Sequence, residues 1–288
     1  MKGIILGAGA GSRLYPSTRS TSKLLLPIYD KPMVYYPMAT LMEANIREVM
    51  LIVSPKDKQK FIELFGDGSQ LGMKISYGVQ EVPTGIVSAF LIGEEFIGDE
   101  PCALVLGDNI FYGKDLVESS LRAVKEAKEG NVTLFGYEVP DPERFGVVEF
   151  DDNKKVLSLV EKPANPRSNY AVTGLYFYPS GVSKVSKRVT PSARGEYEIT
   201  DLNNLYLKEA NVSVELLDKS NLWLDTGTFE SLLEASNIIK EIEEKTPVAA
   251  LEIIAYRNGW ISKEQLIKAG ESMSKNSYGQ MLLKEANK

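Results

Sequence analysis

A glycine-rich segment near the amino terminus contains the first residues suited to ligand binding. It reads Gly7-Ala8-Gly9-Ala10-Gly11-Ser12-Arg13, and Lys23 follows it. Glycines let backbone N–H groups approach phosphate oxygens without a Cβ in the way, and Arg13 and Lys23 add mobile positive charge. We interpret the segment as a polyphosphate-binding loop. For a glycine-rich loop taken alone, the competing interpretation is an ordinary strand-to-helix turn.

Two common phosphate-binding motifs do not fit this loop. A dinucleotide-binding motif needs glycine at the position of Ser12 and an acidic residue at the end of the second strand, where the sequence has Val53-Ser54. A Walker loop ends in Gly-Lys-Ser or Gly-Lys-Thr, and Gly11-Ser12-Arg13 does not match that ending. The sequence therefore argues against both a dehydrogenase and a P-loop ATPase.

Two aspartates follow short apolar stretches that we expect to be strands. Asp108 comes just after Ala103–Leu106, and Asp225 lies between Trp223 and Gly227. Open α/β sheets bind ligands at the carboxyl ends of their strands, and two carboxylates with phosphate oxygens and water suit Mg²⁺. Each aspartate taken singly could equally be a turn residue. Together with the phosphate loop, the pair predicts a magnesium site.

Composition restricts the chemistry further. The chain has 288 residues, no histidine, one cysteine, and 33 basic against 39 acidic side chains, for a net charge of −6. The charge argues against a general nucleic-acid-binding surface, and the missing histidines remove imidazole catalysis and Ser-His-Asp triads. Cys102 alone cannot form an intrachain disulfide, so we expect a reducing cytoplasm. No apolar run approaches the roughly 18 residues of a membrane span, and the apolar start is interpreted as a first strand rather than a signal peptide.

Apolar runs alternate with helical patterns in the first half of the chain. The buried strands expected there are Gly3–Leu6, Val49–Val53, Ala103–Leu106 and Val132–Tyr137. Such alternation predicts an α/β fold with a Rossmann-like, mainly parallel sheet flanked by helices. Before the fourth strand, a helix is expected with Val117, Leu121 and Val124 on one face and Gly130 as its stop.

The pattern changes after Tyr137. Alternating strands are expected at Gly146–Phe150, Val156–Val160 and Ala171–Tyr178, as an antiparallel extension that covers the substrate, and a helix at Glu198–Lys208. From Phe229 the sequence is helical, with a capping box at Ser262–Gln265. We therefore expect a catalytic domain at 1–228, divided into halves at 1–137 and 138–228. A helical tail at 229–288 should pack on the main domain or on another subunit.

The motifs above and several others, in the same order, resemble those of the sugar-nucleotide pyrophosphorylase family. The phosphate loop with its Leu14 and Pro16, and Lys23 followed by Leu25, Leu26 and Pro27, match the family signature, and Tyr29–Met33 resembles in particular the glucose-1-phosphate thymidylyltransferases. Further matching segments are Val79-Gln80, Pro83–Gly85, Leu106–Phe111, Gly146–Phe150, Glu161–Pro163, Arg194–Asp201 and Trp223–Thr228.

The resemblance implies an activity and a set of site residues. The reaction would join dTTP and α-D-glucose 1-phosphate into dTDP-glucose and pyrophosphate, with Mg²⁺ held by Asp108 and Asp225. The implied nucleotide-binding residues are Leu6, Gly7, Ala8, Gly9, Gly11, Ser12, Arg13, Lys23, Gln80, Gly85 and Asp108. The implied sugar-phosphate-binding residues are Asn109, Gly146, Glu161, Lys162, Val172 and Arg194. The implied catalytic residues are Arg13, Lys23, Asp108, Lys162 and Asp225. The resemblance also implies a cytoplasmic homotetramer in dTDP-rhamnose synthesis, with feedback by the end product at a separate site.

The chain departs from the family pattern at three places. Leu24 stands where glutamine is usual, Phe145 where tyrosine is common, and Ile86-Val87-Ser88 where Leu-Ala-Gln is more usual. These departures bear on the choice of base rather than on the reaction type. Two alternatives therefore stay open, a uridylyltransferase that uses UTP and a non-catalytic nucleotide-binding regulator on the same fold.

Overall fold

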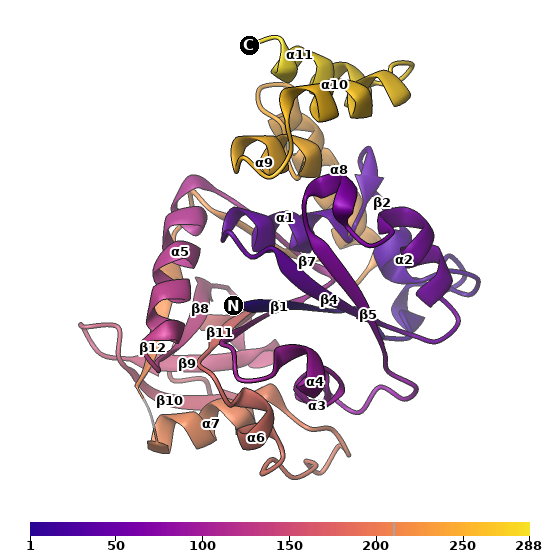
Figure 1. The fold of residues 1–288 in the computed structure, drawn as a ribbon. Helices are drawn as coiled ribbons and strands as arrows, with labels where there is room; N and C mark the ends of the chain where they lie inside the picture. The colour runs from indigo at the N-terminus through magenta and orange to yellow at the C-terminus, as the bar shows by residue number, and fades with distance from the viewer. Residues whose placement is uncertain (210) are drawn as a thin grey trace.

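A nine-stranded mixed sheet forms the centre of the computed structural model, which describes residues 1–209 and 211–288 (Figure 1). Seven strands lie in the order β10-β9-β11-β6-β1-β4-β5, and β8 pairs with both β11 and β12 beside this path. The nine strands are β1 (Lys2–Leu6), β4 (Glu48–Val53), β5 (Lys74–Val79), β6 (Cys102–Leu106), β8 (Val132–Glu138), β9 (Gly146–Phe150), β10 (Val156–Glu161), β11 (Tyr170–Tyr178) and β12 (Val212–Leu217). Two small sheets pair β2 (Pro27–Ile28) with β3 (Lys31–Pro32), and β7 (Asn109–Tyr112) with β13 (Leu222–Asp225).

The first half of the chain builds the parallel part of the sheet. Strand β1 lies between β4 and β6 and runs parallel to both, and β5 extends this part beside β4. The chain thus adds strands on one side of β1 and then returns to add β6 on the other side. Such a reversal leaves a crevice at the carboxyl ends of the two central strands, where open α/β sheets bind ligands.

The second half of the chain adds the antiparallel part. Strand β11 runs antiparallel to β6, β8 and β9, and β10 pairs with β9 as a hairpin. Strand β12 returns parallel to β8. The expected mainly parallel sheet with an antiparallel extension is confirmed.

Helices cover both faces of the sheet. The eleven α-helices are α1 (Tyr35–Glu43), α2 (Lys58–Phe65), α3 (Ser88–Ile92), α4 (Glu94–Ile97), α5 (Lys114–Lys128), α6 (Val182–Ser186), α7 (Ile199–Glu209), α8 (Phe229–Glu243), α9 (Leu251–Arg257), α10 (Lys263–Ser272) and α11 (Ser277–Ala286), counted over the residues that the structure describes. Neighbours on one strand point to opposite faces, so Ile4 and Ile5 of β1 belong to separate cores. Helices α3, α4, α6 and α7 enclose the core that contains Ile4.

The helical tail joins the other core. Helix α9 packs on α1, and α10 and α11 pack on α9 and on each other, at one end of the molecule (Figure 1). The expected capping box begins α10, where the side chains of Ser262 and Gln265 each accept from the other residue's backbone N–H. Among the described residues, no helix is both long enough and apolar enough to cross a membrane.

One helix is oriented differently from the expectation. Helix α5 forms where its pattern predicts it, but the face formed by Val117, Leu121 and Val124 is not the buried one, and Leu121 is 46% exposed. The buried positions include Leu116 and Ala123. Small side chains let the helix approach the sheet closely, so the packed face is not the one that carries the larger apolar residues.

Leu24 is wedged between two glycines at the carboxyl ends of β1 and β6. It is 2% exposed, and a Cβ built on Gly7 would come within 2.1 Å of its Cδ1 atom. A Cβ built on Gly107 would come within 2.5 Å of the same atom. Both distances are far inside van der Waals contact, so the apolar Leu24 requires glycine at both strand ends.

We predict that Gly7→Ala lowers the free energy of unfolding by about 1–3 kcal/mol, because overpacking forces side chains and backbone out of place. The comparison is Gly9→Ala in the same loop, where a Cβ would meet no atom within 4 Å, so its stability should stay close to that of the wild type. Denaturant unfolding provides both values. A double-mutant cycle with Leu24→Ala should show coupling, since Leu24 is the obstruction. If the decreases in the free energy of unfolding caused by Gly7→Ala and Leu24→Ala simply add in the double mutant, the proposed packing is wrong.

Candidate functional site

The phosphate loop and Asp108 lie side by side at the crevice between β1 and β6. The backbone N–H of Gly107 donates to the carbonyl of Leu6 at 2.9 Å, which joins the ends of the two strands. The loop turns at Gly11, whose φ of 61° is in the left-handed region that favours glycine, and Thr18 Oγ1 donates to the Gly11 carbonyl at 2.7 Å. The sequence-predicted loop and the first aspartate are thus brought together.

A lysine from the segment after the loop reaches Asp108. Lys23 begins the short 3-10 helix η2 (Lys23–Leu25), and its Nζ donates to Asp108 Oδ2. Burial raises the pKa of Asp108, but the Lys23 ammonium and its hydrogen bond outweigh burial, so the net pKa lies below the ordinary value. Asp108 is therefore held as a carboxylate.

The second aspartate, Asp225, is positioned by a pair of short strands, β7 and β13. Strand β13 runs antiparallel to β7 with Asp225 opposite Asn109, next to Asp108 in the chain. Burial raises the pKa of Asp225, and the nearby Asp108 carboxylate raises it further. Two like charges held in a partly buried place are costly, and a bound cation would relieve that cost.

Arg13 lies against the loop that carries Asp225. A Cβ built on Gly227 would come within 2.8 Å of a terminal guanidinium nitrogen of Arg13, so a side chain there would displace the guanidinium from its observed position. The same arginine lowers the pKa of Asp225 through its charge, although burial and Asp108 dominate. The amino-terminal loop and the late acidic motif therefore form one charged surface.

Two cavities meet at this surface. The loop cavity, of about 240 Å³, is lined by Leu6, Gly7, Gly9, Ala10, Gly11, Ser12, Arg13, Lys23, Leu24, Asp108 and Gly227. The sheet cavity, of about 480 Å³, is lined by Arg13, Ile86, Leu106, Arg144, Phe145, Gly146, Glu161, Lys162, Val172, Tyr176, Glu198, Ile199, Thr200 and Asp225. Arg13 lines both, and the two aspartates divide between them. Backbone amides and cations suit the loop cavity to a polyphosphate.

Acceptors and donors are arranged along one side of the sheet cavity. Glu161 accepts from Thr200 Oγ1 at 2.6 Å and from Arg194 at 3.3 Å. Lys162 has a φ of 44°, unusual for a residue with a side chain, and its Nζ lies 3.9 Å from Glu161. The side chain of Lys162 is 49% exposed, so it can turn toward a ligand in the cavity.

Not every predicted site residue lines one of these two cavities. Among the described residues, five predicted site residues lie outside the walls of both cavities: Ala8, Gln80, Gly85, Asn109 and Arg194. Asn109 is only 4% exposed and its amide is occupied by protein groups, while Arg194 is paired with Glu198 at 2.9 Å. Arg144 and Gly227 line the cavities but are not among the site residues predicted from the sequence. Arg144 directly precedes the Phe145-Gly146 motif, and a cation in that place could have been noticed.

Gln80 and Gly85, two of the expected nucleotide-binding residues, are joined through Ser88. The hydroxyl of Ser88 donates to the Gly85 carbonyl at 2.5 Å, and Gln80 Nε2 donates to the same hydroxyl oxygen at 2.5 Å. Gly85 has a φ of 104°, and a Cβ there would come within 2.5 Å of the Tyr197 carbonyl oxygen. The departure from the family pattern at Ser88 is thus part of one buried hydrogen-bond chain.

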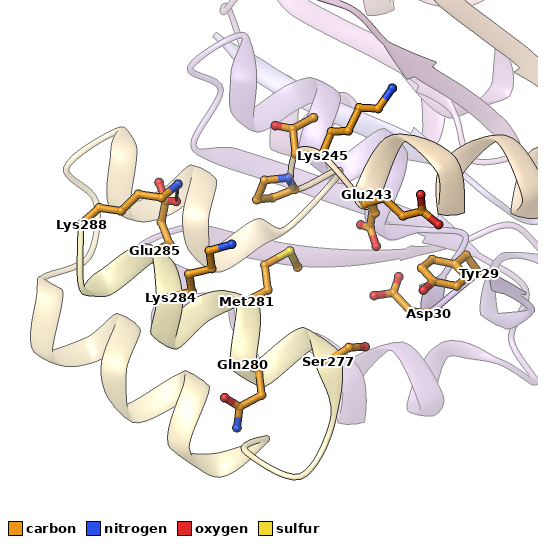
Figure 2. Close-up of a pocket in the computed structure, with 13 residues that line it drawn as sticks. Tyr29, Asp30, Glu243, Lys245, Ser277, Gln280, Met281, Lys284, Glu285 and Lys288 are labelled. Carbon is orange, nitrogen blue, oxygen red and sulfur yellow. Dashed lines mark hydrogen bonds and ion pairs between the residues drawn. The ribbon is translucent and has the colours of Figure 1, made fainter.

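A further hollow lies between the tail and the β2–β3 hairpin (Figure 2). Its volume is about 330 Å³, and α11 and the segment that follows α8 form most of its wall. Three of the four acids in its wall have cationic partners, since Asp30 and Glu243 pair with the buried Lys31, and Glu285 pairs with Arg257 and Lys288. We assign it no chemical role.

The sequence matches the nucleotidyl transferase family over residues 2–242. The chain belongs to that family. It is also 51% identical over 286 residues to a glucose-1-phosphate thymidylyltransferase of Neisseria meningitidis, with 99% of each chain covered. The corresponding Mycobacterium tuberculosis protein is 48% identical over 285 residues, with 98% of each covered. At this identity and coverage, the chain belongs among the glucose-1-phosphate thymidylyltransferases, and it is a nucleotidyltransferase.

Solved structures give the same family. A Bacillus anthracis protein assigned as a glucose-1-phosphate thymidylyltransferase, in complex with sucrose, superposes with a TM-score of 0.75 at 38% identity, covering 84% of this chain and 96% of that one. A UDP-glucose pyrophosphorylase complexed with UDP-glucose gives a TM-score of 0.73 at 26% identity, covering 83% and 98%. The fold alone therefore does not distinguish a glucose-1-phosphate thymidylyltransferase from a UDP-glucose pyrophosphorylase.

We predict that, in metal-free buffer, Asp225→Asn leaves the thermal unfolding midpoint unchanged or raises it. The substitution removes a buried charge that faces Asp108, and burial and that charge together raise the pKa of Asp225. Differential scanning fluorimetry with a chelator measures the midpoint. Asp218→Asn is the comparison, because Asp218 accepts hydrogen bonds from Ser220 and Asn221 and should lose stability. A lower midpoint for Asp225→Asn than for Asp218→Asn would contradict the repulsion.

Proposed function

We propose that this nucleotidyltransferase joins dTTP and α-D-glucose 1-phosphate into dTDP-glucose and pyrophosphate. The observation that carries the proposal is the meeting of the loop cavity and the sheet cavity at Arg13, Asp108 and Asp225. The loop cavity would hold the triphosphate and the sheet cavity the sugar phosphate. Relatives that are about half identical over nearly the full length are glucose-1-phosphate thymidylyltransferases, which supports this choice of substrates.

The reaction needs positioning and charge rather than an acid-base residue. An oxygen of the sugar phosphate attacks the α-phosphorus of dTTP in line, and the bond from that phosphorus to the pyrophosphate oxygen breaks. A phosphate monoester has a second pKa of about 6, so near neutral pH the attacking oxygen is already ionised and requires no general base. This chemistry is consistent with a chain that has no histidine.

The cations divide the work between the two substrates. Arg13, which lines both cavities, would offset charge on the α-phosphate as the transition state forms. Lys162 at the sheet cavity would orient the attacking phosphate, with Arg194 released from its carboxylate partners to help. Glu161 supplies an acceptor for a sugar hydroxyl.

We also propose Mg²⁺ as the cofactor, held by Asp108 and Asp225. Their mutual repulsion and oxygen chemistry fit a hard dication. Within the described residues, no group of three or more acidic, histidine or cysteine side chains could hold a metal, so substrate oxygens and water would complete the coordination, as Mg²⁺ favours. When bound, the ion would neutralise phosphate charge in the transition state.

The remaining family features also belong to this proposal. The enzyme would work in the cytoplasm as a homotetramer, at the start of dTDP-rhamnose synthesis, with end-product feedback at a separate site. Size-exclusion chromatography with light scattering would test the tetramer. The single buried cysteine, Cys102, is consistent with a reducing compartment.

The deciding experiment is pyrophosphate release with each common NTP and dNTP, glucose 1-phosphate and Mg²⁺. The proposal expects the highest kcat/KM with dTTP, product formation only when the sugar phosphate is present, and no turnover in excess chelator. A preference for UTP would make the protein a uridylyltransferase, an alternative that the fold alone does not exclude, because a UDP-glucose pyrophosphorylase superposes with a similar TM-score. Absence of release with every nucleotide would leave the non-catalytic reading.

Lys162→Ala should raise KM for glucose 1-phosphate or lower kcat at least tenfold, while calorimetric binding of dTTP stays within about threefold of wild type. The reason is that Lys162 lines the sheet cavity and not the loop cavity. The matched control is Lys155→Ala, which should leave both values unchanged. Lys155 is an exposed lysine in the turn between β9 and β10, at the opposite end of β10 from Lys162. Loss of dTTP binding with sugar-phosphate binding intact would reverse the assignment of the two cavities.

A further inference from the structure

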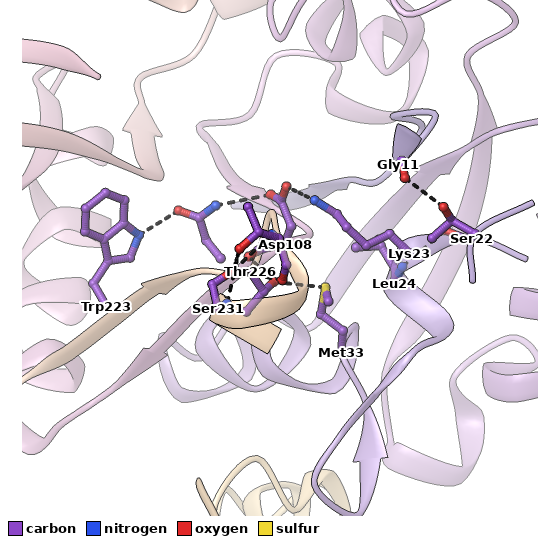
Figure 3. Close-up of polar contacts among 12 residues, drawn as sticks. Gly11, Ser22, Lys23, Leu24, Met33, Asp108, Trp223, Thr226 and Ser231 are labelled. Atoms are coloured by element: carbon purple, nitrogen blue, oxygen red, sulfur yellow. Dashed lines mark hydrogen bonds and ion pairs between the residues drawn. The ribbon is translucent and has the colours of Figure 1, made fainter. Parts of the chain in front are cut away.

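A chain of hydrogen bonds leads from the buried Trp223 to the carboxylate of Asp108 (Figure 3). Trp223 Nε1 donates to Asn109 Oδ1 at 2.7 Å, and Asn109 Nδ2 donates to Asp108 Oδ1 at 3.2 Å. The other carboxylate oxygen, Oδ2, accepts from Lys23. Asp108 is thus held from both sides, by a cation on one oxygen and an amide on the other.

The chemistry of the donors fixes the orientation of the Asn109 amide. Its oxygen also accepts from the backbone N–H of Gly174 at 3.1 Å, and neither that N–H nor an indole N–H can accept a hydrogen bond. The oxygen must therefore face both donors, which leaves the NH₂ group to face Asp108. Gly174 permits this approach, because a Cβ there would come within 2.6 Å of Asn109 Oδ1.

Trp223 and Asn109 are buried and lie on strands that also build the site. Trp223 is 9% exposed and Asn109 is 4% exposed. Trp223 lies two positions before Asp225 on β13, and β13 pairs with β7, which begins at Asn109. One short strand thus carries the second aspartate and also the group that orients the first.

We infer that Trp223 and Asn109 are positioning residues for the transfer reaction. The indole N–H locks the Asn109 amide, and the amide fixes the carboxylate of Asp108 toward the loop cavity. This inference rests on the proposed function, because it assigns Asp108 to the reacting phosphates. Groups that orient a catalytic or metal-binding carboxylate typically change its effectiveness tenfold to a hundredfold.

The first test is Trp223→Phe, which removes the N–H and keeps an aromatic ring against Tyr137 and Phe145. We expect kcat to fall about tenfold to a hundredfold, with KM for dTTP and for glucose 1-phosphate within about threefold of wild type. Trp260→Phe, the other tryptophan of the chain, is the control and should keep the wild-type kcat. An unchanged kcat in Trp223→Phe, or a rise confined to KM for the sugar phosphate, would overturn the inference.

The second variant separates the hydrogen bond between Trp223 and Asn109 from the hydrogen bond between Asn109 and Asp108. Asn109→Asp keeps an oxygen for Trp223 and Gly174 but replaces the NH₂ group with a second oxygen that faces Asp108. We expect kcat to fall at least as far as in Trp223→Phe. Wild-type turnover in Asn109→Asp would show that the contact with Asp108 has no role.

A measurement without substrate tests the hydrogen bond directly. The chain has two tryptophans, so ¹⁵N-indole labelling gives two N–H resonances, and Trp260→Phe assigns them. The Trp223 resonance should be protected from hydrogen exchange, should stay so in Asn109→Asp, and should shift and exchange faster in Asn109→Leu. An unmoved resonance in Asn109→Leu would refute the contact. Because no substrate is present, this result is independent of the proposed function, which fails separately if the wild type forms no dTDP-glucose.

Discussion

The antiparallel pairing of β7 with β13 is the contact on which the rest of the site depends. It places Asp225 opposite Asn109 and thereby sets the two aspartates at the meeting point of the loop and sheet cavities. The buried Thr226 strengthens the junction, because its hydroxyl donates to the Asp108 carbonyl at 2.8 Å and its backbone N–H to the same oxygen at 3.2 Å. The paired backbone thus holds the two carboxylates close together in spite of their mutual repulsion. A rigid frame is what a site needs when it acts mainly by positioning and charge.

The apolar packing beneath this frame explains the departure from the family pattern at Leu24. A leucine there cannot contact a nucleotide as an amide would, but it lies between Gly7 and Gly107 and fills the space where the two strands end. The phosphate loop therefore packs on an apolar side chain, and its polar contacts come from backbone amides, Arg13 and Lys23. The nucleobase would then be selected by other residues, among them Gln80, Ser88 and Gly85, which are joined by hydrogen bonds.

Much of the fold could be predicted because the sheet is buried on both faces. Continuous apolar runs such as Ala103–Leu106 mark central strands, and their ends differ from the observed bounds by a residue or so. The partly exposed β5 and the four-residue β7 could not be predicted in this way, because their sequences lack a long apolar run. The apolar stretch before Asp225 indicated a strand, but its pairing with β7 could not be predicted from so short a run. The site motifs were visible as sequence. Which carboxylate faces which lysine, and that the Asn109 amide is occupied by protein, depends on pairings between distant segments.

The long separation between β7 and β13 has a consequence for the order of folding. Trp223 and Asn109 are 114 residues apart in the chain, and closing a loop of that length costs more conformational entropy than pairing neighbouring strands. Lys23 and Asp108 can meet once the first third or so of the chain has been synthesised, whereas Asp225 joins them only after the antiparallel half has emerged. The ion pair between Lys23 and Asp108 involves no residue of β13, so its formation does not require that strand. The constellation for transfer is complete only when the β13 strand has docked.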